Sequence, residues 1–363
     1  MDHSSAGPVY RHLHQNVIAH FPRRGAMPTA IVASLLLLAA CTSGSSSHGG
    51  SGTTSTAQAA SASGPKMNII MISGGLSDPF YAAFKQGGQQ AAAQLGVRFQ
   101  YLTFTDPSNP TESQYIQDLN TAIAEKPSAI IISDYFPSGD DPILKKEAAA
   151  GLPIVENNTG AATWQQNGAI GFVGQDETLA GEAAGKAEAA AGVKVGLCVV
   201  QFVNNVALVD RCQGYTSAME AAGDKAITLI EPGTDGASDA ATTADIAGEL
   251  RSHPNIDGIF TLGSGYALDA IRAAQEVGRP EKIGTTDIST EVLADVQSGK
   301  LLFTIDQQPY LQGYYSVLIA YQYVKYGLRP VTQITTGPLL ITKSNVGQLE
   351  KINQEYPGIR GAS

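Results

Sequence analysis

Histidine and cysteine most often carry nucleophilic, acid–base and metal-binding chemistry, and both are scarce in this chain. Six histidines occur in the 363 residues, and five of them precede residue 49. Only His253 lies in the rest of the chain, within Ser-His-Pro-Asn, where it is most simply a turn residue. A Ser-His-Asp triad or a His-rich metal centre would lack its central residue. The sequence therefore predicts no catalytic residue, no metal ion and no cofactor.

Cys41 ends an N-terminal segment that has the features of an export signal. Arg23 and Arg24 precede the apolar run 30–40, which matches the core of a signal peptide in length and is too short to span a bilayer comfortably. The run closes in Leu-Ala-Ala-Cys, which resembles the bacterial lipobox. We expect residues 1–41 to be a lipoprotein signal segment with the lipid on Cys41. The alternative is an ordinary secretory signal with a coincidental cysteine.

Residues 42–65 are nearly all Gly, Ser, Thr and Ala and carry no charged side chain. Such a segment cannot bury a core, so it is expected to be a flexible tether. The folded part would then lie at the outer face of the cell membrane and touch it only through the lipid. The formal net charge of −10 excludes nucleic acid as a partner, because phosphate binding requires a basic surface.

Cys198 and Cys212 remain once Cys41 is assigned to lipidation. An even pair in an exported chain favours a disulfide, since the expected strand around Cys198 and the next helix can bring the two sulfurs together. Two buried free thiols are the alternative.

Strands and helices alternate through the rest of the chain. Short apolar runs predict strands at 67–73, 98–104, 129–133, 153–156, 169–173, 194–200, 226–230, 258–262, 282–285 and 301–305. Helices are expected at 79–95, 111–125, 142–150, 178–190, 206–222, 238–251, 267–277, 290–298 and 310–325. This alternation predicts an α/β fold of two doubly wound parallel-sheet lobes with five or six strands each. Ligands of such sheets bind at the carboxyl ends of the strands.

The loops after these strands resemble those of ribose-type periplasmic sugar-binding proteins, which serve ABC importers and have the type I periplasmic binding protein fold. The resemblance starts at Ser73-Gly-Gly-Leu-Ser-Asp-Pro-Phe-Tyr81 and continues at Leu152-Pro-Ile-Val155 and Arg211-Cys-Gln-Gly-Tyr215. It recurs at Tyr266-Ala-Leu-Asp-Ala270, Ile283-Gly-Thr-Thr-Asp287 and Gly299-Lys-Leu-Leu-Phe-Thr-Ile-Asp-Gln-Gln-Pro309. The blocks follow the family's order from residue 66 onward.

The resemblance implies a two-lobed protein with a three-stranded hinge near Gly174, Gln308 and Gly337. One lobe would comprise residues 66–173 and 308–336, and the other residues 174–307 and 337–363. It also implies a ligand site. The residues that match the family's sugar contacts are Asp78, Phe80, Tyr81, Asp134, Asn158, Arg211, Asp287 and Gln307. Arg211 is expected to oppose Asp78 or Asp287 across the ligand, because a buried charge must be paired.

The sequence also departs from the family pattern. Thr159 stands where the family usually has Arg, and Gly263 stands where it usually has Asn. The first loop is one residue longer than in ribose-binding proteins. The expected ligand is therefore a small sugar or polyol rather than ribose in particular. Carboxylates, amides and Arg recognise hydroxyl groups, and aromatic rings cover apolar sugar faces.

Each candidate has a plainer interpretation. Asp78 before Pro79 is a favourable N-cap, and Asp287 could cap the helix that follows it. Gln307 could be a connector, and Arg211 could be solvated. Phe80 and Tyr81 are adjacent, so one is expected in the core and the other in the cleft. Three further aromatics, Tyr135, Phe136 and Trp164, could line the pocket or merely pack.

The leading hypothesis is a monomeric solute-binding lipoprotein that delivers its ligand to an ABC permease and its ATPase. An alternative with the same fold is a receptor that presents a sugar-like signal to a sensor kinase. An exported carbohydrate-active enzyme would need a carboxylate pair such as Asp78 and Asp287, but no independent motif supports it. A sugar-sensing transcription regulator is excluded, because the signal segment and tether occupy the place of its DNA-binding domain.

Overall fold

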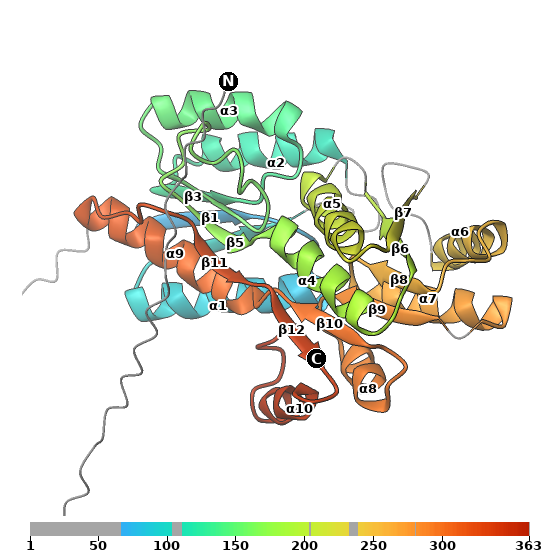
Figure 1. Ribbon diagram of the computed structural model, residues 1–363. Helices are drawn as coiled ribbons and strands as arrows, with labels where there is room; N and C mark the ends of the chain where they lie inside the picture. Colours follow the sequence, from blue (N-terminus) through green and yellow to red (C-terminus); the bar gives the residue numbers. More distant parts are fainter. Residues whose placement is uncertain (1–66, 104–110, 203–204, 232–238, 280, 363) are drawn as a thin grey trace, which may run out of the picture. The chain divides into compact units, whose positions relative to one another are not determined.

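The computed structural model describes residues 67–103, 111–202, 205–231, 239–279 and 281–362. The expected signal segment with Cys41 and the expected tether, residues 1–65, lie outside these residues. Within the described parts, the chain forms two six-stranded sheets with helices on both faces of each (Figure 1). Among these helices, none combines the length and the apolar character needed to cross a membrane. The predicted fold class, two doubly wound α/β lobes, is confirmed.

The first sheet is parallel throughout, with strand order β11-β5-β4-β3-β1-β2. Its strands are β1 (Asn68–Ile72), β2 (Arg98–Leu102), β3 (Ala129–Ile132), β4 (Ile154–Asn157), β5 (Gly171–Gln175) and β11 (Ile334–Gly337). Its helices are α1 (Pro79–Leu95), α2 (Glu112–Ala124), α3 (Pro137–Ala149) and α9 (Pro309–Tyr326). The order reverses at β1, whose neighbours β2 and β3 lie on opposite sides.

The second sheet has the order β12-β10-β9-β8-β6-β7 and reverses in the same way at β6. Its strands are β6 (Val195–Val200), β7 (Lys225–Ile230), β8 (Gly258–Thr261), β9 (Lys282–Thr286), β10 (Phe303–Asp306) and β12 (Leu339–Thr342). Its helices are α4 (Glu177–Ala190), α5 (Val206–Ala221), α6 (Asp239–Ser252), α7 (Ser264–Val277), α8 (Thr290–Ser298) and α10 (Val346–Glu355). Strand β12, which was not among the expected strands, pairs antiparallel with β10, and the other strand pairs of this sheet are parallel.

Alternate side chains of β1 enter different cores, which explains its continuous apolar sequence. Ile69 and Met71 pack under α1 and α9, whereas Ile70 and Ile72 pack under α2 and α3. The second sheet repeats this arrangement, with α4 and α5 on one face and α6, α7, α8 and α10 on the other (Figure 1). Burial of both faces is the usual environment of a parallel strand.

The chain passes between the two sheets three times. It leaves the first sheet after β5, returns between β10 and α9, and leaves again between β11 and β12. Gln308 lies in the second passage and has φ 56°, in the left-handed region. Its backbone N–H donates to Asp306 Oδ1 (2.7 Å), and its side-chain amide donates to the carbonyl of Thr336 in β11. The second and third passages are thereby joined by hydrogen bonds.

Several element boundaries differ from the expectations. Strands β11 and β12 and helix α10 were not predicted. Helix α3 begins at Pro137 rather than at Pro142, which lies inside the helix. The backbone N–H of Phe136, the residue before this start, donates to Asp140 Oδ2 (3.4 Å). The N–H groups at a helix start have no partner within the helix, so this side chain supplies one.

Candidate ligand-binding site

The loop after β1 supplies the first candidate residues. Asp78 caps α1, with its Oδ1 accepting from the amide of Phe80 (2.9 Å). Asp78 as a whole residue is exposed, but the protein around its carboxyl group removes water from it and so raises its pKa, against the lowering effect of that hydrogen bond. Phe80 packs in the core with 5% exposure, whereas Tyr81 is half-buried. The structure thus assigns Phe80 to the core and leaves Tyr81 as the aromatic that meets polar groups.

Tyr81 belongs to a chain of hydroxyl and amide groups. The hydroxyl of Tyr135 donates to Tyr81 Oη (2.6 Å) and lies 3.3 Å from Asn158 Oδ1. Ser73 Oγ lies 3.3 Å from the same Tyr135 hydroxyl and 2.7 Å from Ser133 Oγ. These residues follow or end β1, β3 and β4, which meet around the reversal point of the first sheet. Tyr135 therefore joins the site rather than merely covering the sheet edge.

Gln312 on α9 connects this series of hydrogen-bonded groups to the second sheet. Asn158 Nδ2 donates to Gln312 Oε1 (3.4 Å), and Gln312 Nε2 donates to the carbonyl of Gln307 (3.1 Å). Gln307 Nε2 then donates to Asp287 Oδ1 (2.7 Å). Gln312 is fully buried. The predicted residues Tyr81, Asn158, Gln307 and Asp287 are consequently linked through two residues, Tyr135 and Gln312.

Asp287 follows β9 and has φ 72°, a left-handed conformation that Asp tolerates better than most residues. Burial raises its pKa to about 7, against the opposite charge of Arg211. The charge of Asp78 raises this pKa further, and the hydrogen bond from Gln307 lowers it. The charge on Asp287 is thus influenced both by Asp78 of the first sheet and by Arg211 of the second.

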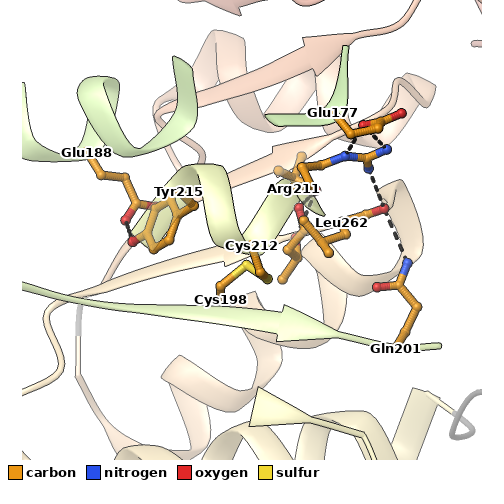
Figure 2. Close-up of a disulfide and its surroundings, with 10 residues drawn as sticks. Glu177, Glu188, Cys198, Gln201, Arg211, Cys212, Tyr215 and Leu262 are labelled. Atoms are coloured by element: carbon orange, nitrogen blue, oxygen red, sulfur yellow. Dashed lines mark hydrogen bonds and ion pairs between the residues drawn. A yellow bond between two sulfur atoms is a disulfide. The ribbon is translucent and has the colours of Figure 1, made fainter. Parts of the chain in front are cut away.

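Arg211 on α5 is buried, and its partner is Glu177 at the start of α4 (Figure 2). Its Nη1 also donates to the carbonyl of Leu262 (3.5 Å), which accepts from Gln201 Nε2 (3.2 Å) as well. Glu177, the partner of Arg211 in this structure, was not among the expected residues, and opposition of Arg211 to Asp78 or Asp287 across a ligand stays a prediction. Glu177 already neutralises the guanidinium, and the charge of Asp287 acts on Arg211 as a secondary contribution that raises its pKa.

A disulfide joins Cys198 on β6 to Cys212, the residue after Arg211 (Figure 2). The two Cα atoms are 5.8 Å apart, within the usual range for a disulfide. The first turns of α5 are therefore tied covalently to the sheet on which they pack. The alternative of two free thiols does not describe this structure.

Asp134 follows β3 and lies among other buried acids. Thr163 Oγ1 donates to its Oδ2 (2.9 Å), and burial raises its pKa to about 6. Glu156 lies beside it, where burial raises the pKa to about 9, and Asp140 has a pKa raised to about 8 by the same cause. Gly160 (φ 103°) covers this group, since a Cβ there would lie 2.3 Å from Glu156 Oε2.

A pocket of about 250 Å³ lies next to these residues and is lined from both sheets. Its walls include Asp134, Asn158 and Thr159 of the first sheet and Asp176, Glu177 and Asp210 of the second. Of the eight predicted contacts only Asp134 and Asn158 line it. Tyr81, Arg211, Asp287 and Gln307 lie beside it, joined to it through Asn158 and Glu177.

Sequence reasoning missed Glu177, Gln312 and Glu156 and left Tyr135 undecided. Glu177 directly follows the helix-capping Asp176, and an acidic residue in a first helical turn is common, so its position in the sequence does not mark it as functional. Trp164 packs in the core of the first sheet, and Phe136 contacts the rings of Tyr115 and Tyr135.

Comparison with known proteins accords with this arrangement. Residues 69–328 match the family described as periplasmic binding protein domain. The chain belongs to this family. Its members and fold are those of binding proteins and not of enzymes.

Relatives of this periplasmic binding protein include the xylose/arabinose-binding protein XylF of Sulfolobus acidocaldarius, 25% identical over 300 residues that cover 78% of this chain and 72% of the relative. The ribose import binding protein RbsB of Haemophilus influenzae is 25% identical over 73% of this chain and 88% of its own length. A crystal structure of a carbohydrate transporter from Acidothermus cellulolyticus in complex with myo-inositol is 33% identical, with TM-score 0.74. The match covers 82% of this chain and all of that one.

Proposed function

We propose that this periplasmic binding protein captures a small sugar or polyol between its two lobes and delivers it to an ABC permease and its ATPase. The observation that carries the proposal is the series of hydrogen bonds that runs from Tyr81 and Asn158 of the first sheet, through Tyr135 and Gln312, to Gln307 and Asp287 of the second. The charges of Asp78 and Arg211 also act on Asp287. A ligand held there would join the two lobes. The names of the relatives, which refer to xylose, arabinose, ribose and myo-inositol, support the same ligand class.

The chemistry of these groups suits hydroxyl-rich molecules. Each hydroxyl group donates and accepts one or more hydrogen bonds, so it can match a carboxylate of Asp287 or a guanidinium N–H of Arg211. The ring of Tyr81 can cover an apolar C–H face. Asn158, Asp134 and Gln307 complete the proposed contacts.

The hinge of the proposed two-lobed clamp consists of the three passages near Gly174, Gln308 and Gly337. Asn158, Asp287 and Gln308 all have positive φ values, of 58°, 72° and 56°. Such conformations cost about 1–3 kcal/mol each and tend to occur at functional sites, which supports a role for this region in binding or closure.

A thermal-shift screen with pentoses, hexoses and polyols, myo-inositol included, tests the proposed ligand class. A true ligand at 100 times its dissociation constant adds about 2.7 kcal/mol to the free energy of unfolding. We expect at least one neutral or substituted sugar or polyol to raise the melting temperature. If no sugar or polyol of any kind does so at 10 mM, the proposed function is wrong.

Membrane anchoring through a lipid on Cys41 is a separate proposal that rests on the sequence of residues 23–41. In a bacterial host with lipoprotein processing, the wild-type chain should sediment with membranes, and Cys41→Ala should release it or leave its signal uncleaved. A Cys41→Ala chain that sediments and is processed like wild type would contradict lipidation. Light scattering of the released chain tests the expected monomer.

A further inference from the structure

The pocket between residues 158–163 of the first sheet and residues 176–178 and 206–210 of the second has an unusual charge pattern. Four carboxylates line it, those of Asp134, Asp176, Glu177 and Asp210. No lysine, arginine or histidine is among its lining residues in the described parts of the chain. Arg211 pairs with Glu177, whereas Asp134, Asp176 and Asp210 have no basic partner among the residues that line the pocket in the described parts of the chain.

The carboxylates of Asp210 and Asp176 repel one another. Asp176 Oδ1 accepts from the amide of Leu179 (3.0 Å) as the cap of α4, and Asp210 lies half-buried in the first turns of α5. Burial, followed by the charge of Asp176, raises the pKa of Asp210. A cation between them would relieve this repulsion.

Two buried polar atoms independently indicate a ligand. Thr159 lines the pocket with 3% exposure, and its hydroxyl has no hydrogen-bond partner within the described residues. Oε1 of Glu177, a residue with 7% exposure on the same pocket, is likewise unpartnered there. A buried polar atom without a partner costs about 1–3 kcal/mol, and a ligand that supplies N–H donors would remove this cost.

The pocket shares Asn158 with the proposed sugar site and adjoins it through hydrogen bonds. Asn158 lines it and is bonded to Tyr135, while Glu177 lines it and holds Arg211. A ring seated against Tyr81, Arg211 and Asp287 would therefore border the pocket. The acids do not favour a metal ion, because the described residues contain no cluster of His, Cys, Asp or Glu side chains arranged to hold one.

We propose that this pocket is a subsite for an ammonium group, so that the ligand is an amino-substituted sugar or polyol rather than a neutral one. An ammonium carries three donors, which match the carboxylates of Asp176 and Asp210 and the unpartnered oxygens of Thr159 and Glu177. This inference rests on the proposed function and specifies the ligand of the same site.

Calorimetry on the full chain at pH 7 tests the subsite with matched pairs: D-glucose and D-glucosamine, D-galactose and D-galactosamine, scyllo-inositol and scyllo-inosamine. We expect at least one amino compound to bind ten times more tightly than its neutral counterpart. Asp210→Asn should reduce that advantage to threefold or less and leave the affinity for the neutral compound unchanged. Glu220→Gln removes a charge from an exposed position on the same helix and should preserve the advantage.

Thr159→Val provides a second, nearly isosteric variant, and it should also reduce the preference for the amino compound. Putrescine and ammonium chloride distinguish a subsite for a substituent from a site for a free cation. If neutral compounds bind and no amino compound is preferred, the subsite is wrong and the proposed function stands. Binding of putrescine alone, without a preferred amino sugar, also overturns it. If neither kind of sugar binds, the proposed function itself fails.

Discussion

Arg211 directs two N–H groups at one oxygen of Glu177, with Nε and Nη2 each 2.7 Å from Oε2. The same oxygen accepts from Gln175 Nε2 (2.9 Å), the last residue of β5. Both charged side chains are buried. The ion pair therefore fixes the guanidinium of α5 relative to the first turn of α4, at the point where the chain enters the second sheet.

Replacement of Glu177 should lower the free energy of unfolding. Glu177→Ala leaves the buried guanidinium without its counter-ion, and we expect a loss of about 3–5 kcal/mol in the free energy of unfolding, measured with urea. Glu177→Gln keeps an acceptor and should lose less. Glu182→Ala breaks an exposed pair with Lys186 on the same helix, and its expected loss is below about 1 kcal/mol. Equal losses for Glu177→Ala and Glu182→Ala would show that the buried pair has no special role.

Asp287 should dominate ligand affinity. Asp287→Ala is expected to weaken the best sugar or polyol at least tenfold, since a charge-assisted hydrogen bond contributes roughly 1.5–3 kcal/mol. The circular dichroism spectrum should not change. Because Ala tolerates the left-handed backbone poorly, Asp287→Asn is the second variant. Glu291→Ala, an exposed change on α8, is the control. Affinity equal to wild type in both Asp287 variants would remove this residue from the site.

The ligand-free protein should lose stability as pH rises from about 5 to 9. Burial raises the pKa of six carboxyls to between about 6 and 9: Asp134, Asp140, Glu156, Glu188, Glu231 and Asp287. In the unfolded chain these groups titrate near 4, so the folded state binds more protons across this range. Their contribution to stability is complete below pH 4 and disappears as pH passes the folded pKa values.

Urea unfolding at pH 5, 7 and 9 measures this dependence. Glu156→Gln should reduce the loss of stability between pH 7 and 9, because the pKa of Glu156 is raised to about 9. Stability that rises between pH 5 and 9 would mean that these carboxyls are not buried as described.

The disulfide should stabilise the fold without contributing to binding. Cys198 and Cys212 are 14 residues apart, and a loop of this length corresponds to about 3 kcal/mol in the chain-entropy estimate. The double variant Cys198→Ser, Cys212→Ser should lose about 2–4 kcal/mol and retain its sugar affinity. Mass spectrometry after alkylation should find both cysteines unalkylated until a reductant is added. Alkylation of both before reduction would refute the bridge.

Gln312 should affect binding although it lies behind the contact residues. Gln312→Leu removes the acceptor of Asn158 Nδ2 and the side-chain donor to the Gln307 carbonyl. We expect ligand affinity to fall three- to tenfold while the cooperative unfolding transition is retained. Gln322→Leu, a partly exposed change on the same helix, should leave affinity unaltered. An equal effect of both variants would point to general damage to α9.

Much of the fold was predictable because local sequence decides it. Ile69, Ile70, Met71 and Ile72 form a continuous apolar run, which is how a strand buried on both faces is encoded. Asp78 before Pro79 marked a helix start, and the structure shows that cap. Strands β11 and β12 were not predictable in this way, since each has four residues, lies at a sheet edge, and is separated from the other only by Pro338.

The site was predictable only in part, because its pairings join distant residues. Glu177 and Arg211 are 34 residues apart, and Asn158 and Gln312 are 154 apart, so no spacing in the sequence relates them. The resemblance identified Arg211 and Asn158 but gave no information on the residues that hold them. For this reason the sequence did not indicate Glu177 as the partner of Arg211.

Strands β11 and β12 have a consequence for how the protein is made. One edge strand of each sheet comes from a single stretch, residues 334–342, which follows all the other strands in the described parts of the chain. A ribosome that has not yet released this stretch leaves β5 and β10 each with an unpaired backbone edge, open to association with other chains. Neither half can therefore finish folding ahead of the other during synthesis, and an exported chain would reach its mature form only after translocation of this final segment.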